Sequence, residues 1–167
     1  VLFRSTLYHN GADSTGSGEF WLQFNVRDTV IKNNIFYADS DGVFVSNWYA
    51  SPVDTTMDNN IYFGGNGSGS SQWAWNNGYL QGYSNWQTAS GYDANSVFVD
   101  PLFVDASTFD FHLQSQSPAV DTGTTTGMEG NLDYDGSIRV FGNAVDIGAL
   151  EYISQTPSPD EWHFTNN

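Results

Sequence analysis

The stretch Asn33-Asn34-Ile35-Phe36-Tyr37 recurs as Asn59-Asn60-Ile61-Tyr62-Phe63, 26 residues later, and Thr6-Leu7-Tyr8 is a weaker copy. Three short strands with their turns take about this many residues, at ~3.3 Å per strand residue. Asn tolerates left-handed backbone geometry, and stacked Asn side chains can hydrogen-bond between repeats. We therefore predict successive coils of a β-solenoid, in which both Asn-Asn pairs are structural and Ile35 and Ile61 point inward. A β-sandwich with two similar hairpins is the alternative.

The composition is typical of a turn-rich, all-β protein. The chain has 167 residues, the size of one domain, with 16% aromatic residues, 17 glycines and no cysteine. Its 19 acidic and 4 basic residues give a formal charge of −15. Nucleic acid and anionic membranes bind through Lys and Arg, so neither is expected as a partner. A polyanionic substrate would also be repelled unless calcium intervened.

The sequence pattern divides the chain into four segments. Residues 1–5 read as a non-native start, because Val1-Leu2-Phe3-Arg4-Ser5 matches the translation of a common sequencing adapter and Arg4-Ser5 replaces the Asn-Asn pair. We expect native sequence from Thr6, in a truncated reading frame from a bacterial metagenome. Residues 6–83 are expected to form coils, residues 84–153 the last coils and a cap, and residues 154–167 a tail or linker.

The cap is expected to contain one short helix. Residues 84–90 begin with Ser84, an N-cap candidate, and stop before Gly91, which suits a helix end. Short strands are expected at 96–99, 101–104 and 109–113, and again at 138–141 and 145–152. Such a cap would cover the apolar cross-section and the unpaired strand edge of the last coil.

The second half carries spaced motifs in a recognisable order. They are Trp86-Gln87 to Gly91-Tyr92-Asp93-Ala94-Asn95-Ser96, Asp100-Pro101-Leu102-Phe103, Phe111-His112-Leu113, Ser117-Pro118-Ala119-Val120-Asp121, Asp133-Tyr134-Asp135-Gly136, Arg139 and 145–151. This order resembles the C-terminal portion of bacterial right-handed parallel β-helix proteins of the pectate-lyase-like superfamily, over about residues 30–152. The resemblance implies that fold and a secreted or surface-anchored protein. It fixes no reaction, because the fold hosts lyases, hydrolases, binding modules and surface proteins.

Arg139 is the only Lys or Arg after Lys32. Its planar guanidinium can bind carboxylates bidentately, so we expect a structural ion pair around it. The carboxylates expected to gather there are those of Asp121, Asp133, Asp135, Asp146 and Glu151.

A run of aromatic residues is the first candidate for chemistry. Flat amphipathic rings suit the faces of sugars. Trp73, Trp75 and Tyr79 follow a Gly/Ser-rich stretch, and Trp48 with Tyr49 could extend the same wall. We predict a carbohydrate-binding flank of these five residues. The alternative is that the rings cover the solenoid and anchor the cap, which we favour for Tyr83 and Trp86.

Acidic turns are the second candidate. Asp39-Ser40-Asp41-Gly42 and Asp133-Tyr134-Asp135-Gly136 each place two carboxylates beside a tight turn, and calcium takes several oxygen ligands. Asp39 and Asp41 are therefore candidate calcium ligands, and Ca²⁺ is the one candidate cofactor. Neither run completes an EF-hand loop, and turn chemistry explains both equally well. The three histidines lack the spacing of a zinc site.

Catalytic residues are not identified by any pattern. A lyase needs a basic residue, for which Arg27, Lys32 and Arg139 are available. A glycoside hydrolase needs two carboxylates roughly 5–10 Å apart. Asp39 with Asp41, or Asp54 with Asp58, would serve, but so would many turn aspartates.

Three functions follow from these patterns. The leading hypothesis is recognition of an extracellular or cell-surface polysaccharide by the aromatic flank, with a neutral plant or microbial glycan fitting the charge best. The second is a truncated polysaccharide lyase or glycoside hydrolase. The third is a structural surface or filament protein that self-associates through its open N-terminal coil.

Overall fold

The chain builds mostly β-strands and one short α-helix. The computed structural model describes residues 1–11, 17–23, 26–40, 42–48, 54–125 and 130–154. The elements are β1 (Leu2–Phe3), β2 (Thr6–Tyr8), β3 (Phe20–Trp21), β4 (Val30–Lys32), β5 (Ile35–Ala38), β6 (Val43–Asn47), β7 (Thr56–Asp58), β8 (Ile61–Gly64), β9 (Gln72–Trp75), β10 (Gly78–Gln81), α1 (Tyr83–Ser90), β11 (Val97–Phe98), β12 (Phe103–Asp105), the 3-10 turn η1 (Ala106–Thr108) and β13 (Asp110–Leu113).

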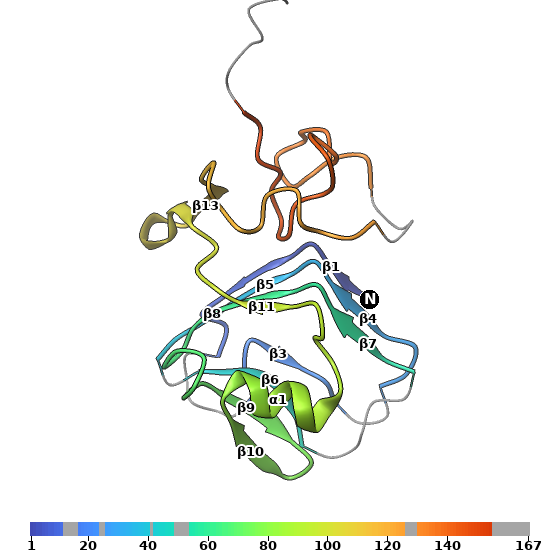
Figure 1. Cartoon of the computed structure of the whole chain (residues 1–167), viewed down its shortest axis with the longest axis vertical. Helices are drawn as coiled ribbons and strands as arrows, with labels where there is room; N and C mark the ends of the chain where they lie inside the picture. The colour runs from blue at the N-terminus through green and yellow to red at the C-terminus, as the bar shows by residue number, and fades with distance from the viewer. Residues whose placement is uncertain (12–16, 24–25, 41, 49–53, 126–129, 155–167) are drawn as a thin grey trace, which may run out of the picture.

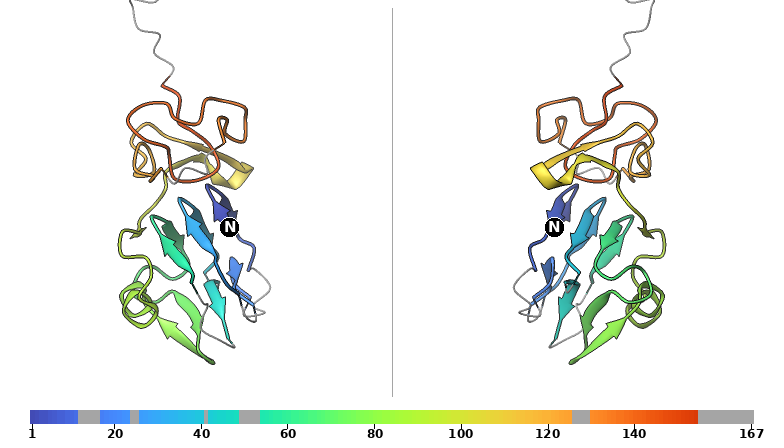
Figure 2. Two further views of the ribbon diagram at one scale, coloured as in Figure 1. Left: turned by 90° about the vertical axis from the view of Figure 1, so that its right-hand side faces the viewer. Right: turned by 90° about the vertical axis from the view of Figure 1, so that its left-hand side faces the viewer.

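Successive repeats lie side by side as parallel strands (Figures 1 and 2). One sheet has the order β1-β4-β7, the second β11-β8-β5-β2 and the third β10-β9-β6-β3. In the second sheet Thr6 pairs with Ile35, and Ile35 pairs with Ile61. The sequence repeat therefore sets the register between strands.

The predicted fold class is wrong in its central claim. Strands dominate and the helix is short, but the described residues form four separate sheets rather than one continuous right-handed parallel β-helix, and no closed solenoid. The third sheet is mixed, because β9 and β10 pair antiparallel. Asn76 and Asn77 cause the reversal, since both take positive φ (49° and 63°) in a two-residue turn. This geometry is favoured in hairpins.

The C-terminal segment also departs from the predicted coils. After β11 the chain leaves the stack and forms the antiparallel pair β12–β13, in a sheet of its own. The predicted strands at 138–141 and 145–152 are absent, apart from an isolated bridge between Leu132 and Ile138. Side-chain oxygens take the place of a strand partner here, because Asp146 accepts N–H bonds from Asp121 (2.7 Å) and Tyr152 (2.6 Å).

The two faces of the second sheet pack into different cores. Phe36 and Tyr62 stack in the core between the sheets, with ring centroids 5.1 Å apart. Ile35 and Ile61 point the other way and pack against the C-terminal segment. Neighbouring strand residues face opposite sides, so the inward prediction for the two isoleucines was wrong by one position.

A polar column runs through the repeats beside this core. The Asn34 side chain donates to Asn60 Oδ1 at 3.0 Å, and Asn60 donates to Asp93 Oδ1 at 3.1 Å. Asn33 and Asn59, one position earlier, take positive φ of 57° and 54°. The first Asn of each pair therefore makes the turn, and the second links one repeat to the next.

The helix α1 covers the end of the third sheet (Figure 1). Its cap is Gly82 rather than Ser84, whereas Gly91 ends it in left-handed geometry as predicted. Trp86 is buried and its ring stacks on Trp73, at 6.1 Å between centroids. Among the described residues, no helix has the length and apolar content to cross a membrane.

Candidate binding cleft

A cleft of about 890 Å³ lies between the first strands and the C-terminal segment. One wall comes from the N-terminal end of the chain, one from the hairpin β12–β13, and one from the loop of residues 131–139. The lining residues are Phe3, Arg4, Ser5, Thr6, Thr108, Phe109, Asp110, Phe111, His112, Leu132, Asp133, Tyr134, Asp135, Arg139, Ala149 and Leu150.

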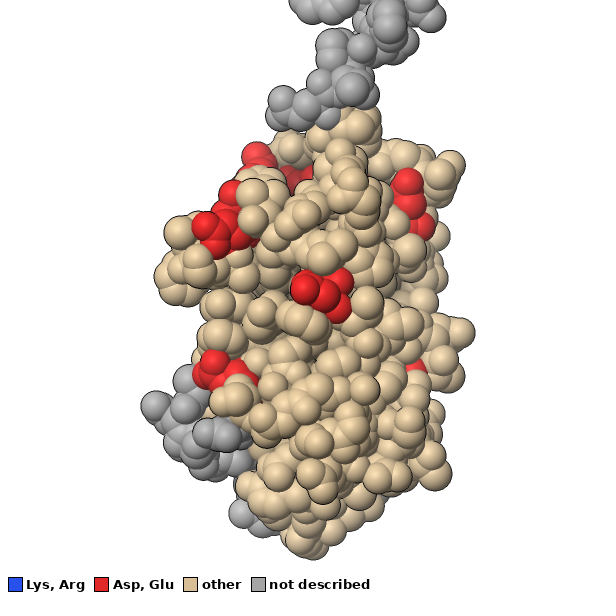
Figure 3. Space-filling model, turned by 60° about the vertical axis from the view of Figure 1, so that its left-hand side comes forward, with Lys and Arg blue, Asp and Glu red and all other residues tan. Residues whose placement is uncertain are grey.

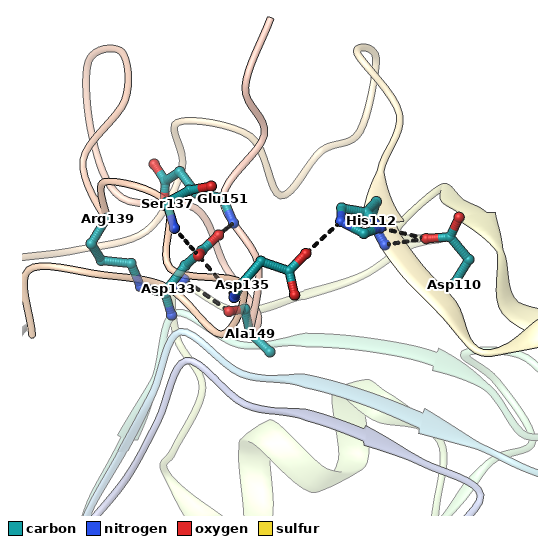
Figure 4. A network of polar contacts seen from close by, with 8 residues as sticks. All are labelled: Asp110, His112, Asp133, Asp135, Ser137, Arg139, Ala149 and Glu151. Carbon is teal, nitrogen blue, oxygen red and sulfur yellow. Dashed lines mark hydrogen bonds and ion pairs between the residues drawn. The ribbon is translucent and has the colours of Figure 1, made fainter.

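His112 bridges two aspartates in this cleft (Figure 4). Its Nδ1 lies 2.6 Å from Asp110 Oδ1, and its Nε2 lies 2.8 Å from Asp135 Oδ2. The hydrogen bond to Asp110 raises the pKa of His112 above 6.5, and the bond to Asp135 adds to this, while partial burial opposes it. An imidazolium that donates to a carboxylate at each end is the form that these contacts favour.

Asp133 holds the loop that carries Asp135. Its Oδ1 accepts the backbone N–H groups of Asp135 (3.0 Å) and Ser137 (2.7 Å), and its Oδ2 accepts that of Glu151 (2.9 Å). These three bonds fix a tight turn, as expected for Asp in Asp-x-Asp-Gly. Asp133 is therefore occupied by the backbone, whereas Asp135 faces the cleft.

Arg139 lies buried at the base of the cleft without the predicted ion pair. Its guanidinium donates to the carbonyl oxygens of Ala149 (3.1 Å) and Gly148 (3.0 Å). Within the described part of the chain, no carboxylate oxygen lies within 4.0 Å of it. Burial lowers the pKa of Arg139 from its ordinary value, and nearby Arg4 adds to this. Arg139 therefore has the predicted structural role, but it binds backbone carbonyl oxygens instead of carboxylates.

Two aromatic rings stand at the cleft with large exposed surfaces. Phe109 is 70% exposed and Tyr134 is 85% exposed. Phe109 also holds a positive φ of 63°, which is unusual for a bulky residue. Each ring directly precedes one of the carboxylates that His112 bridges, so the aromatic and polar parts of the cleft share the same two segments.

Two of the five residues in the predicted aromatic flank are buried. Trp73 is 0% exposed and Trp75 is 8% exposed, which corrects their predicted place on a solvent-facing wall. They are buried because they pack under α1 against Trp86. Trp48 and Tyr79 do meet edge to face, at 4.9 Å, and Tyr79 is 52% exposed. Tyr49 lies outside the described residues.

The candidate calcium residues are only partly described. Asp39 lies 3.1 Å from His9 Nδ1, and Asp41 is outside the described residues. In the described ranges no group of three or more His, Cys, Asp or Glu side chains is placed to hold a metal. The calcium site stays a prediction.

The bridging residues of the cleft lie in two short sequence motifs whose contact the sequence did not predict. Asp110-Phe111-His112 and Asp133-Tyr134-Asp135 are each visible as short motifs. Their meeting depends on how the C-terminal segment folds over the sheet, because His112 and Asp135 are 23 positions apart in the sequence. No local periodicity encodes that contact.

The surface agrees with the acidic composition. One face of the molecule shows several carboxylates and no Lys or Arg among its described residues, and most of them lie over the C-terminal segment (Figure 3). A surface of this kind disfavours polyanionic ligands.

Comparison with known proteins adds one distant similarity. The chain is 26% identical over 119 residues to the "Uncharacterized protein YwoF" of Bacillus subtilis (strain 168), a match that covers 71% of this chain and 25% of that protein. The chain thus spans about a quarter of that relative. No family model matches the chain, and no solved structure matches it significantly. The resemblance to the pectate-lyase-like superfamily stays a prediction.

Proposed function

We propose that this chain recognises a carbohydrate in the cleft, as a binding part of an extracellular or cell-surface protein. The observation that carries the proposal is the pairing of two exposed rings, Phe109 and Tyr134, with the carboxylates of Asp110 and Asp135 in one concave site. Rings stack on sugar faces, and carboxylates accept hydrogen bonds from hydroxyl groups. Binding pockets commonly combine apolar walls with a few convergent polar groups.

The geometry of Phe109 supports a role for its ring. A left-handed backbone costs free energy for any residue with a side chain, and glycine would avoid that cost. The ring meets Tyr8 and Phe111 edge to face, at 6.0 and 6.3 Å between centroids, and stays 70% exposed. This φ makes Phe109 the C-cap of η1, where glycine is the usual residue, and a large exposed ring at such a position supports a role in binding.

Charge points to a neutral glycan. The formal charge of −15 repels polyuronates, and Arg139 is occupied by carbonyl oxygens. We therefore expect a hemicellulose or another uncharged plant or microbial polysaccharide.

Affinity electrophoresis against soluble xylan, β-glucan and pectin tests the proposal. We expect retardation on a neutral glycan, and about three- to tenfold weaker binding for Tyr134→Ala and Phe109→Gly. Phe109→Gly removes the ring and relieves its backbone, so its unfolding midpoint should not fall. Tyr79→Ala, at an exposed ring outside the cleft, is the matched control. Absence of retardation on every glycan, or a loss confined to Tyr79→Ala, would refute binding in the cleft.

Self-association is a second candidate with an observation of its own. Within the described residues, β1, β2 and β3 each have a strand neighbour on one side only. Such edges can pair with another chain. Sedimentation velocity across a range of concentrations tests this, and a monomer throughout would exclude it.

Hydrolysis is not favoured by the arrangement of the two carboxylates. A glycosidase pair needs free space between its carboxyl groups for the sugar bond or a water molecule. Here the imidazole of His112 fills the space between Asp110 and Asp135.

A further inference from the structure

The two ring-bearing walls of the cleft are linked by one side chain. Within the described residues, His112 Nε2 to Asp135 Oδ2, at 2.8 Å, is the one side-chain hydrogen bond between β12–β13 and the 131–139 loop. On the β13 side the ring is fixed by Asp110, at 2.6 Å. The bridge thus joins the residue after Phe109 to the residue after Tyr134.

We propose that protonated His112 is a positioning residue that sets the spacing of Phe109 and Tyr134 and thereby tunes ligand binding in the cleft. The effect on binding rests on the proposed function, whereas the bridge itself exists without a ligand.

The chemistry of the imidazole explains why a proton is needed. The imidazolium donates from both ring nitrogens, so it satisfies both carboxylates. Neutral imidazole donates from one nitrogen and presents a lone pair at the other. One of the two contacts then becomes a repulsion between a lone pair and a carboxylate oxygen. The shorter contact, to Asp110 on the same strand, retains the remaining proton, so deprotonation breaks the bond to Asp135 that ties the 131–139 loop to β13.

The charged groups around His112 are mostly acidic. Asp110 lies on its own strand, Asp105 precedes η1, and Asp133 and Asp135 lie on the opposite loop. Two cations, Arg4 and Arg139, also line the cleft. The excess of carboxylates favours the protonated ring, in line with the raised pKa of His112. None of the bridge or ring residues belongs to residues 1–5.

The sign of the pH dependence follows directly. The pKa of His112 is higher in the folded chain than the ordinary 6.5, so the bridge is complete below pH 6.5 and is lost as pH rises through the folded pKa. Glycan affinity should fall over the same range. The groups are partly exposed, so we expect a loss of about three- to tenfold rather than abolition.

Three measurements on the whole chain test this, namely imidazole titration, hydrogen exchange of the loop and glycan affinity across the pH range. Proton NMR of the three imidazoles from about pH 5 to about pH 9 gives their pKa values, with His112→Gln and His9→Gln assigning the resonances. Hydrogen exchange of residues 130–139 over the same range is compared between the parent chain and His112→Gln, which cancels the intrinsic pH dependence. His9 pairs with one aspartate, Asp39, and does not line the cleft, so His9→Gln is the matched control.

The expected result is that exchange in the loop rises in the parent chain as His112 loses its proton, and is already high and flat in His112→Gln. Glycan affinity should follow the same midpoint and lose its pH dependence in His112→Gln but not in His9→Gln. Loop protection that ignores the state of His112 overturns the inference, whether or not a glycan binds. If the loop responds but no glycan binds, the bridge stands and the proposed function fails. If a glycan binds without this pH profile, the positioning role fails.

Discussion

Asp93 receives four side-chain donors in the interior. Ser96, Trp86, Asn60 and Tyr62 all hydrogen-bond to its carboxylate, between 2.6 and 3.1 Å. Burial raises its pKa, and the four hydrogen bonds oppose that shift. A buried carboxylate persists only where such donors offset its lost hydration. The polar column is therefore the part of the core whose stability depends most on complete hydrogen bonding.

We expect Asn60→Ala to destabilise the fold by about 2–4 kcal/mol, because it removes one of the four donors to the buried Asp93 carboxylate and the Oδ1 that accepts from both the backbone and the side-chain amide of Asn34. Urea unfolding measures the change. Asn59→Gly is the matched control one position earlier, where φ is 54°, and should change stability by less than about 0.5 kcal/mol. Equal losses in both variants would contradict the separate roles of the two asparagines.

The sequence correctly predicted some of the roles of individual residues. Repetition of Asn-Asn gave the register, because identical residues in successive strands can satisfy one another. It could not give the direction of Ile35 and Ile61, since both faces of the second sheet are apolar and alternation alone does not say which is inside. Nor could it place Trp73 in the core, because a Trp at a surface platform and one under a helix look alike in sequence.

Among the elements, the β9–β10 hairpin ends the parallel pairing of the third sheet, whereas β11 still adds a parallel strand to the second sheet. Its turn uses two asparagines in left-handed geometry, followed by Gly78. Asn77→Gly should stabilise the protein by a few tenths of a kcal/mol, whereas Asn77→Val should cost about 1–2 kcal/mol, because a β-branched residue resists positive φ. Thermal unfolding checks both. Similar midpoints for the two variants would mean that the turn does not limit the hairpin.

The motif Asn76-Asn77-Gly78 is a hairpin-turn signal that is present in the sequence. A hairpin predicted at this motif would have argued against a continuous solenoid. The C-terminal segment was harder, because its strands were predicted from apolar runs. In the structure, Asp and Asn side chains supply the hydrogen bonds that a neighbouring strand would have supplied, as Asn33 does for Thr124 (3.0 Å).

For the molecule as a whole, the free energy of unfolding should be greatest under mildly acidic conditions. Burial raises the pKa of Glu19 and of Glu151 from 4.5 to about 7. The folded state thus binds these protons more tightly than the unfolded state, so stability is gained as pH falls from about 7 toward 4.5 and is lost on the way back. His112 acts in the same direction. We expect a higher unfolding midpoint at about pH 5 than at about pH 8.

Glu19→Gln and Glu151→Gln should each flatten that dependence. Asp28→Asn is a control, because it removes one exposed carboxylate at a left-handed position that Asn also tolerates, and Asp28 is not among the groups that shift the pKa of either glutamate. A midpoint that rises steadily toward pH 8 in the parent chain would show that neither glutamate is held as its acid.

The column formed by Asn34, Asn60 and Asp93 limits how a chain of this kind can change in length. Each side chain in the column hydrogen-bonds to the next, and Asn34 and Asn60 are 26 positions apart. A shift of the chain by one position would place Ile35 or Ile61 where an amide is required. Insertions and deletions inside the strands are then tolerated only in whole repeats, whereas the turns between strands remain free to grow. The hydrogen bonds of the column therefore restrict the lengths of insertion that this architecture can accept during evolution.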